Sequence, residues 1–282
     1  MVMKAEKRPP NLFIGTSGWS YPSWRGPFFP PRLAVTKHLA FYAEQFRTTE
    51  LNGVFYRTPS EDAVSGWVRQ TPDKFVFAWK ASKFVTHWKR LKETSRNSLD
   101  LMESRLNLLG AKAGPVIFQL PHHFEKDTDR LVSFLALLST ERIYAFEFRH
   151  PSWYSDDVFT ALADHGVAFC ISDHHQAPSP WVATTRHLYV RAHGPGGRYR
   201  DRYPGKMLAA WAKDLGKMIS RGQTAYVYFD NDQKSAAPKD AARFMQICDK
   251  ESGLRVARPT TAVIEDPKIR AGSRRAPTAS SQ

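Results

Sequence analysis

Charged and hydrogen-bonding side chains recur at the ends of short apolar runs along this chain. Carboxylates and a histidine at such positions could transfer protons, and Arg or Lys could bind an anion. We take Glu50, Glu147 and His193 as candidate proton-transfer residues. The candidate substrate-binding residues are polar or aromatic and lie near the same run ends: Trp19, Asn52, Tyr56, Lys80, Gln119, Arg149, His150, Trp153, Arg191, Asp230 and Asn231.

The apolar runs predict the elements that would hold these residues. Helix-like segments separate most of the runs, and strands alternating with helices predict an α/β TIM-barrel-like (β/α)8 barrel. The strand ends of such a barrel form one rim, where barrel enzymes carry their active sites. The connection after the sixth strand, residues 173–185, holds no clear helix and is irregular. We expect strands at 12–16, 48–52, 75–80, 115–120, 143–148, 167–172, 187–193 and 224–229.

Side-chain alternation predicts which face of each strand is interior. Residues two apart on a strand share a face. In the fifth run, Ala145, Glu147 and Arg149 share one face, and bulky aromatic residues occupy the other. We expect the bulky faces to meet the helices and the mixed faces to line the barrel interior near its mouth.

Structural roles compete with these assignments. Glu50 could form a buried ion pair with Lys80 on the next strand, and Glu147 could pair with Arg149. Trp153 could pack under its loop instead of walling a pocket. A desolvated Lys80 could also form a Schiff base.

The segment YFDND, residues 228–232, leaves a similar choice. Asp230 and Asp232 could bind a divalent cation, Asp230 could orient Arg191, or the segment could form a turn that caps a helix. No zinc-type spacing of His, Cys, Asp and Glu is present. Acids and bases at the strand ends nearly balance, which favours a polar or anionic organic ligand. We predict no cofactor, with a divalent metal as the alternative.

Composition and charge set the domain organisation. We expect a disordered segment at 1–11, one barrel domain at 12–254, and a basic disordered tail at 255–282. The formal net charge is +14, and the tail contributes +4 from six Lys or Arg and two acids. No run approaches the roughly 20 apolar residues of a membrane span, and the first residues lack the apolar stretch of a signal peptide. We expect a cytoplasmic protein without membrane association.

Three functions fit these observations. The first is an enzyme that binds a small polar or anionic substrate at the barrel mouth. The second is a nucleic-acid binder or metal-dependent nuclease, suggested by the net charge, because Lys and Arg neutralise phosphates. The third is a barrel that binds a ligand without turnover.

Several long stretches resemble the domain-of-unknown-function 72, or YecE-like, family. They run in order from Ile14 to Ala242 and include IGTSGWSYPSWRGPFFP, ELNGVFYRTPS, FAWKASKFVTH, GPVIFQLP, FEFRHPSW, VRAHG and YVYFDND. His122 and Ser235 depart from the residues usual in that family. The resemblance implies a TIM-barrel-like fold and no established activity.

Overall fold

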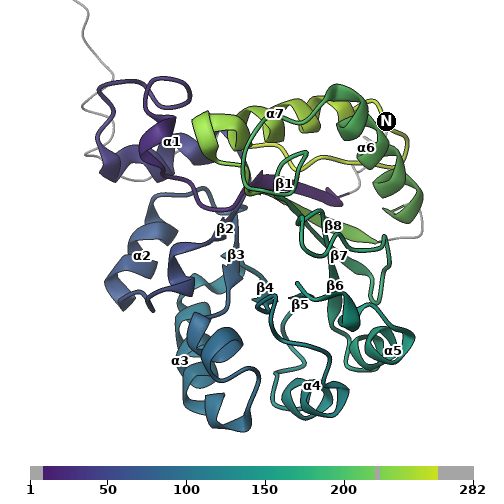
Figure 1. The fold of residues 1–282 in the computed structure, drawn as a ribbon. Helices are drawn as coiled ribbons and strands as arrows, with labels where there is room; N and C mark the ends of the chain where they lie inside the picture. The colour runs from purple at the N-terminus through teal and green to yellow at the C-terminus, as the bar shows by residue number, and fades with distance from the viewer. Residues whose placement is uncertain (1–8, 220–222, 260–282) are drawn as a thin grey trace, which may run out of the picture.

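Eight parallel strands form a nearly closed barrel in the computed structural model, which describes residues 9–219 and 223–259 (Figure 1). Each strand pairs with its neighbours in chain order, from β2 through to β8, and β8 pairs with β1. All eight strands were predicted within two residues at either end. They are β1 (Leu12–Thr16), β2 (Thr48–Leu51), β3 (Val76–Lys80), β4 (Ala113–Gln119), β5 (Tyr144–Glu147), β6 (Ala168–Ser172), β7 (His187–Ala192) and β8 (Thr224–Phe229).

Helices follow the strands around the outside of the barrel (Figure 1). Two begin where the sequence places a cap: Ser60 accepts a hydrogen bond from the Ala63 amide, and Asp127 accepts one from the Arg130 amide. As predicted, no helix lies between β6 and β7, a stretch that is fully described. The helices are α1 (His38–Gln45), α2 (Glu61–Arg69), α3 (Arg96–Leu109), α4 (Thr128–Leu135), α5 (Asp156–Asp164), α6 (Gly205–Ile219) and α7 (Ala236–Cys248).

The barrel closes between β1 and β2 through fewer contacts than elsewhere. A single bridge pairs Ser17 with Glu50, and the Tyr42 hydroxyl from α1 lies between the two strands. It accepts from the Thr16 amide at 2.9 Å and donates to the Thr48 carbonyl at 3.0 Å. The strands approach so closely that a Cβ on Gly15 would lie 2.1 Å from that carbonyl oxygen.

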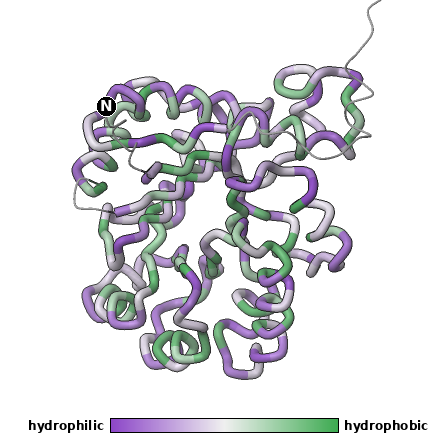
Figure 2. The backbone as a smooth tube through the Cα atoms, turned by 180° about the vertical axis from the view of Figure 1, so that it is seen from behind, coloured by the Kyte–Doolittle hydropathy of each residue, from purple (hydrophilic) through white to green (hydrophobic). Residues whose placement is uncertain are grey.

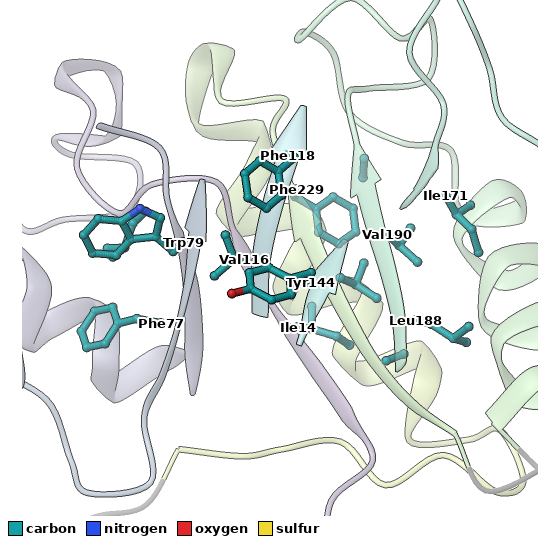
Figure 3. Packing of buried hydrophobic residues seen from close by; sticks show 14 of the residues in the cluster. Ile14, Phe77, Trp79, Val116, Phe118, Tyr144, Ile171, Leu188, Val190 and Phe229 are labelled. Carbon is teal, nitrogen blue, oxygen red and sulfur yellow. The ribbon is translucent and has the colours of Figure 1, made fainter. Parts of the chain in front are cut away.

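Two apolar layers fill the fold, as side-chain alternation predicts. The larger lies between the strands and helices, and Figure 3 shows some of its residues, with Phe77 and Trp79 on one side of β3. Hydrophobic and hydrophilic residues alternate along the surrounding helices (Figure 2), which suits elements with one buried face. The smaller layer fills the barrel interior with Ala78, Ile117, Ala145, Ala168, Cys170, Tyr189, Tyr226 and Tyr228.

The ordered chain continues past the predicted start of the tail. The Arg255 carbonyl accepts from the Asn11 amide at 3.0 Å, and the Ala257 amide donates to the Leu12 carbonyl at 2.8 Å. Residues 255–257 therefore extend along β1, and placing a disordered tail from 255 was wrong for this stretch. Residues 1–8 and 260–282 lie outside the described part. No helix within that part has the length and apolar character to cross a bilayer.

Candidate active site at the mouth of the barrel

A cavity of about 520 Å³ opens at the carboxyl ends of the strands, and we call it the polar cavity. Five strands contribute a residue at or just after their ends: Asn52, Lys80, Gln119, Arg149 and Asp230. Loops complete the lining with Tyr21, Phe55, Tyr56, Lys83, Pro121, Gln176, Tyr199, Asp232 and three histidines, His87, His122 and His123. The strand ends predicted to share a rim do meet here.

Beneath the polar cavity, Arg191 is fully buried and is held by three carboxylates. It donates two hydrogen bonds to Glu50, at 3.1 and 2.8 Å, one to Glu147 at 2.7 Å and one to Asp230 at 2.7 Å. Glu50 also accepts from Ser17 and Tyr189. A buried charge is tolerated only when it is paired and hydrogen-bonded, and this network meets both conditions.

The network fixes the charge of its members. Burial opposes ionisation of Glu50, but the nearby Arg191 and Lys80 outweigh it and hold the pKa of Glu50 below its usual value. In Glu147, burial is outweighed by Arg149 and Arg191, and the pKa lies well below its usual value. Burial likewise disfavours the Arg191 cation, yet the three carboxylates raise its pKa. These groups therefore stay ionised at neutral pH.

His193 sits beside this network as a neutral ring. Its Nε2 lies 3.3 Å from nitrogen atoms of both Arg149 and Arg191. Guanidinium nitrogens only donate, so Nε2 accepts and the ring proton lies on Nδ1, 3.3 Å from Asp173. Burial, together with the two arginines, lowers the pKa of His193 well below its usual value despite the attraction of Glu147.

Lys80 and Asp230 line the polar cavity with pKa values displaced toward neutrality. Burial and the neighbouring Arg191 lower the pKa of Lys80 to about 8. Burial raises the pKa of Asp230 to about 6, although Arg191 and Lys80 oppose the shift. Both groups can therefore exchange protons near neutral pH.

Each of these two side chains keeps bonding capacity for a ligand. Among the described residues, the Lys80 ammonium donates one hydrogen bond, to Asn52 at 3.2 Å, and forms no ion pair. It lies 4.3 Å from the centre of the Phe55 ring. Asp230 receives Arg191 on Oδ2, and no described residue donates to its Oδ1. The predicted Glu50–Lys80 ion pair is absent from the described residues, because Glu50 pairs with Arg191.

The structure places the three predicted proton-transfer residues deeper than the cavity lining. Glu50, Glu147 and His193 are all fully buried and lie below the polar cavity. Arg191, predicted to bind a substrate, is buried at the same level, and its guanidinium donates to the three carboxylates and to His193. Alternation along a strand identified the inward face correctly but did not give depth along the barrel axis.

Three of the predicted binding residues lie outside the polar cavity and make structural contacts. Trp153 is fully buried, stacks on Phe148 with ring centres 4.7 Å apart, and donates to the Phe124 carbonyl at 2.6 Å. His150 accepts from the Ser152 amide and caps a short helix. Asn231, also buried, donates to Asp240 at 3.0 Å and to the Asp201 carbonyl at 2.7 Å. None of the three lines the polar cavity.

Trp19 belongs to a second cavity of about 540 Å³ beside the first, which we call the aromatic cavity. None of the described residues that line it is charged. Three residues, Tyr21, Asn52 and Tyr56, line both cavities. The other residues of the aromatic cavity are Gly18, Ser20, Val35, Thr36, Leu39, Gly53, Trp67 and Gln70.

Several lining residues were not among the predicted site residues. A π-helical turn, Phe84–Trp88, follows β3 and places His87 at the polar cavity. Lys83, which also lines the cavity, immediately precedes this turn. Such turns are frequent at functional sites, but no periodicity in the sequence revealed this one. Tyr199, with a positive φ of 63°, hydrogen-bonds to Arg149. The sequence did contain one signal for His87: it belongs to FAWKASKFVTH, one of the stretches that carry the family resemblance.

A metal-ligand set is not apparent in the described part of the chain. No group of three or more His, Cys, Asp and Glu side chains there is arranged to hold an ion. The two cysteines, Cys170 and Cys248, are both buried and unpaired. The cavity's bonding groups are therefore those of its Lys, Arg, amide, imidazole and carboxylate side chains.

Comparison with known proteins defines the family. The model of "Protein of unknown function DUF72" matches residues 13–263. The protein YunF of Bacillus subtilis is 26% identical over 276 residues, covering 86% of this chain and 97% of that protein. The protein YecE of Escherichia coli K12 is 30% identical over 145 residues, 51% of this chain and 50% of that protein.

Solved structures agree with this assignment. A DUF72 family protein of Thermotoga maritima superposes with a TM-score of 0.76 and 28% identity, covering 85% of this chain and 99% of that one. A DUF72 protein of Enterococcus faecalis shares the fold, with a TM-score of 0.73 and 17% identity, covering 84% and 95%. With its barrel and the family stretches at the barrel mouth, the chain belongs to the DUF72 family.

Proposed function

We propose that this protein is an enzyme that binds a small anionic organic molecule in the polar cavity and transfers protons on it. The observation that carries the proposal is the pairing of Lys80 and Asp230 in one cavity, each with unused bonding capacity and a pKa near neutrality. Catalytic acids and bases need pKa values close to the working pH.

The cavity has two electrostatically different sides. Lys80, Lys83 and Arg149 line it from the β3–β5 side, and Asp230 with Asp232 lines it after β8. An anion is attracted to the first side, which brings the rest of the molecule toward the carboxylates. Lys80 then neutralises the anion or donates a proton, and Asp230 accepts one through its free Oδ1.

The buried network supports these residues from below. Arg191 holds Asp230 in place and stabilises its carboxylate, while Glu147 orients Arg149 through a 2.9 Å hydrogen bond. Fixed charges and dipoles arranged before the substrate arrives need no reorganisation during the reaction. Glu50, Glu147, His193 and Arg191 are therefore proposed as positioning residues.

The proposal is tested by ligand binding followed by isotope exchange. Small phosphates and carboxylates are screened by thermal shift, since a ligand of the native state raises the unfolding temperature. Hits are incubated in D2O with the protein, and loss of C–H signals is followed by proton NMR. We expect Lys80→Met to weaken binding about tenfold or more and Asp230→Asn to slow exchange about 100-fold or more.

The other outcomes separate the alternatives. A ligand that binds through Lys80 but shows neither exchange nor turnover would support a non-catalytic barrel. Anions that bind equally well to Lys80→Met would overturn the proposed site.

Nucleic-acid binding is a second candidate, favoured by the segment 83–90 beside the cavity. Its Trp88 is 70% exposed, and Lys89 lies 5.3 Å from the centre of the Phe84 ring. Exposed aromatic and basic side chains together are typical of single-strand binding. Retention of single-stranded DNA that falls with salt and is lost in Trp88→Ala would support it. Retention unchanged in Trp88→Ala would contradict a role for this segment.

A further inference from the structure

The aromatic cavity adjoins the polar cavity and differs from it in the charge of its lining. Trp19, Tyr21, Tyr56 and Trp67 supply aromatic surface, and within the described part of the chain no charged residue lines it. Tyr56 is 75% exposed and Val35 61% exposed, both unusually open for large apolar side chains. Exposed apolar surface in a concave site marks a binding region.

Three residues join the two cavities. Lys80 donates to Asn52 Oδ1 at 3.2 Å, and Asn52 Nδ2 lies 3.5 Å from the Tyr21 hydroxyl. Asn52, Tyr21 and Tyr56 each line both cavities. Lys80 therefore bonds directly to a side chain that also lines the aromatic cavity.

The charge distribution indicates what each cavity accepts. Three cationic side chains, Lys80, Lys83 and Arg149, line the polar cavity, and they suit a doubly charged anion. Their potential also acts on His87, whose pKa falls to about 4 through burial and the nearby Lys80 and Lys83. The uncharged aromatic cavity suits a neutral, flat group that can stack on indole and phenol rings.

We propose that the substrate is a phosphate monoester carrying an aromatic or heteroaromatic ring, with the phosphate at Lys80 and the ring in the aromatic cavity. This inference rests on the proposed function, whose anion site it uses. It adds the substrate class and assigns Trp19 and Tyr56 to recognition of the ring. The two cavities, about 520 and 540 Å³, are each of the size typical for small-molecule sites.

The test compares phenyl phosphate with methyl phosphate, which carries the same anion without the ring. Isothermal titration of the full chain should give roughly tenfold tighter binding for phenyl phosphate, because ring stacking and burial add to the anion contacts. Trp19→Ala, at a residue that lines the aromatic cavity and not the polar one, should reduce that preference while leaving methyl phosphate binding unchanged. Tyr56→Ala should also reduce the preference. Tyr56 is largely exposed, so its replacement keeps the fold even if loss of the partly buried Trp19 does not.

Two controls separate this inference from the proposed function. Trp88 is an exposed tryptophan that lines neither cavity, so Trp88→Ala should bind both esters as the unmodified protein does. Lys80→Met should lose both esters. Equal affinity for the two esters would overturn the ring site and leave the anion site standing. Binding of neither ester would overturn this inference together with the phosphate form of the anion site.

Discussion

Arg191 organises the centre of this molecule. Four of its five N–H groups donate to three buried carboxylates and the fifth to His193 Nε2, so among the described residues all its donors have partners and its contribution to any reaction is indirect. The residues that can contact a ligand lie one layer higher, at Lys80, Arg149 and Asp230. Barrel interiors are built in such layers. Here the buried layer fixes the positions of charged side chains, and the layer above it places charged side chains in the polar cavity.

Replacement of Arg191 should be among the most destabilising single changes. Arg191→Met leaves buried carboxylates unpaired and should lower the free energy of unfolding by at least about 3 kcal/mol. The comparison variant Arg142→Met removes a partly exposed ion pair with Glu103 and should cost about 1 kcal/mol or less. Urea unfolding measures both, and equal losses would contradict the central role of Arg191.

The free energy of unfolding lost in Arg191→Met should depend on pH in a definite direction. In the native protein the pKa values of Glu50 and Glu147 are lowered, so their contribution is present above the unfolded pKa and is lost as the pH falls. Without Arg191, burial favours their protonated forms. The stability gap between the two proteins should therefore shrink from pH 7 to pH 5. A gap that widens on acidification would contradict this account.

Lys80 should titrate with a pKa of about 8, because burial and Arg191 disfavour its charge. NMR of reductively ¹³C-methylated protein resolves individual lysines, and Lys80→Arg assigns the resonance. Asp230→Asn should lower this pKa further, since Asp230 stabilises the ammonium. A Lys80 pKa near the usual 10.5 would contradict the proposed proton chemistry.

The junction of β1 and β2 shows how one helix side chain completes a barrel. Tyr42 bonds to both strands where direct pairing is sparse, and Gly15 permits their close approach. This junction carries Ser17 and Glu50, so it positions the buried network. The hydroxyl thus links helix α1 to the site.

Removing the Tyr42 hydroxyl should open this junction. Tyr42→Phe leaves the Thr16 amide and Thr48 carbonyl without this partner and should cost about 1–3 kcal/mol of unfolding free energy. The matched variant Tyr56→Phe alters an exposed hydroxyl and should leave stability unchanged. Similar stability of Tyr42→Phe and the unmodified protein would show that the junction closes without this bridge.

The sequence patterns predicted the strands well and the site incompletely. Period-two alternation and polar run ends located every strand, because each strand combines a buried outer face with an inward mixed face. Depth could not be predicted: Glu50 and Lys80 both point inward, yet the strand register sets Glu50 opposite Ala78, two residues before Lys80. The positions of Trp153 and Asn231 outside the polar cavity could not be predicted either, because loop packing decides their contacts, and such contacts have no period in the sequence.

The two ends of the described chain meet along β1, which gives a prediction for truncation. A chain ending at Leu254 loses the hydrogen bonds of Arg255 and Ala257 to Asn11 and Leu12. It should be about 2 kcal/mol less stable than one ending at Pro259, which keeps them. Thermal and urea unfolding of both truncations provide the measurement, and equal stabilities would show that this pairing contributes nothing.

Anomalous diffraction from a tungstate-soaked crystal would show whether Lys80 marks an anion site at the barrel mouth. Tungstate is a tetrahedral dianion whose position the anomalous signal reveals without assumptions about the substrate. We expect a peak in the polar cavity within hydrogen-bond reach of Lys80 Nζ, and no such peak in Lys80→Met crystals. Peaks confined to other surfaces, or a cavity peak that persists in Lys80→Met, would contradict this expectation.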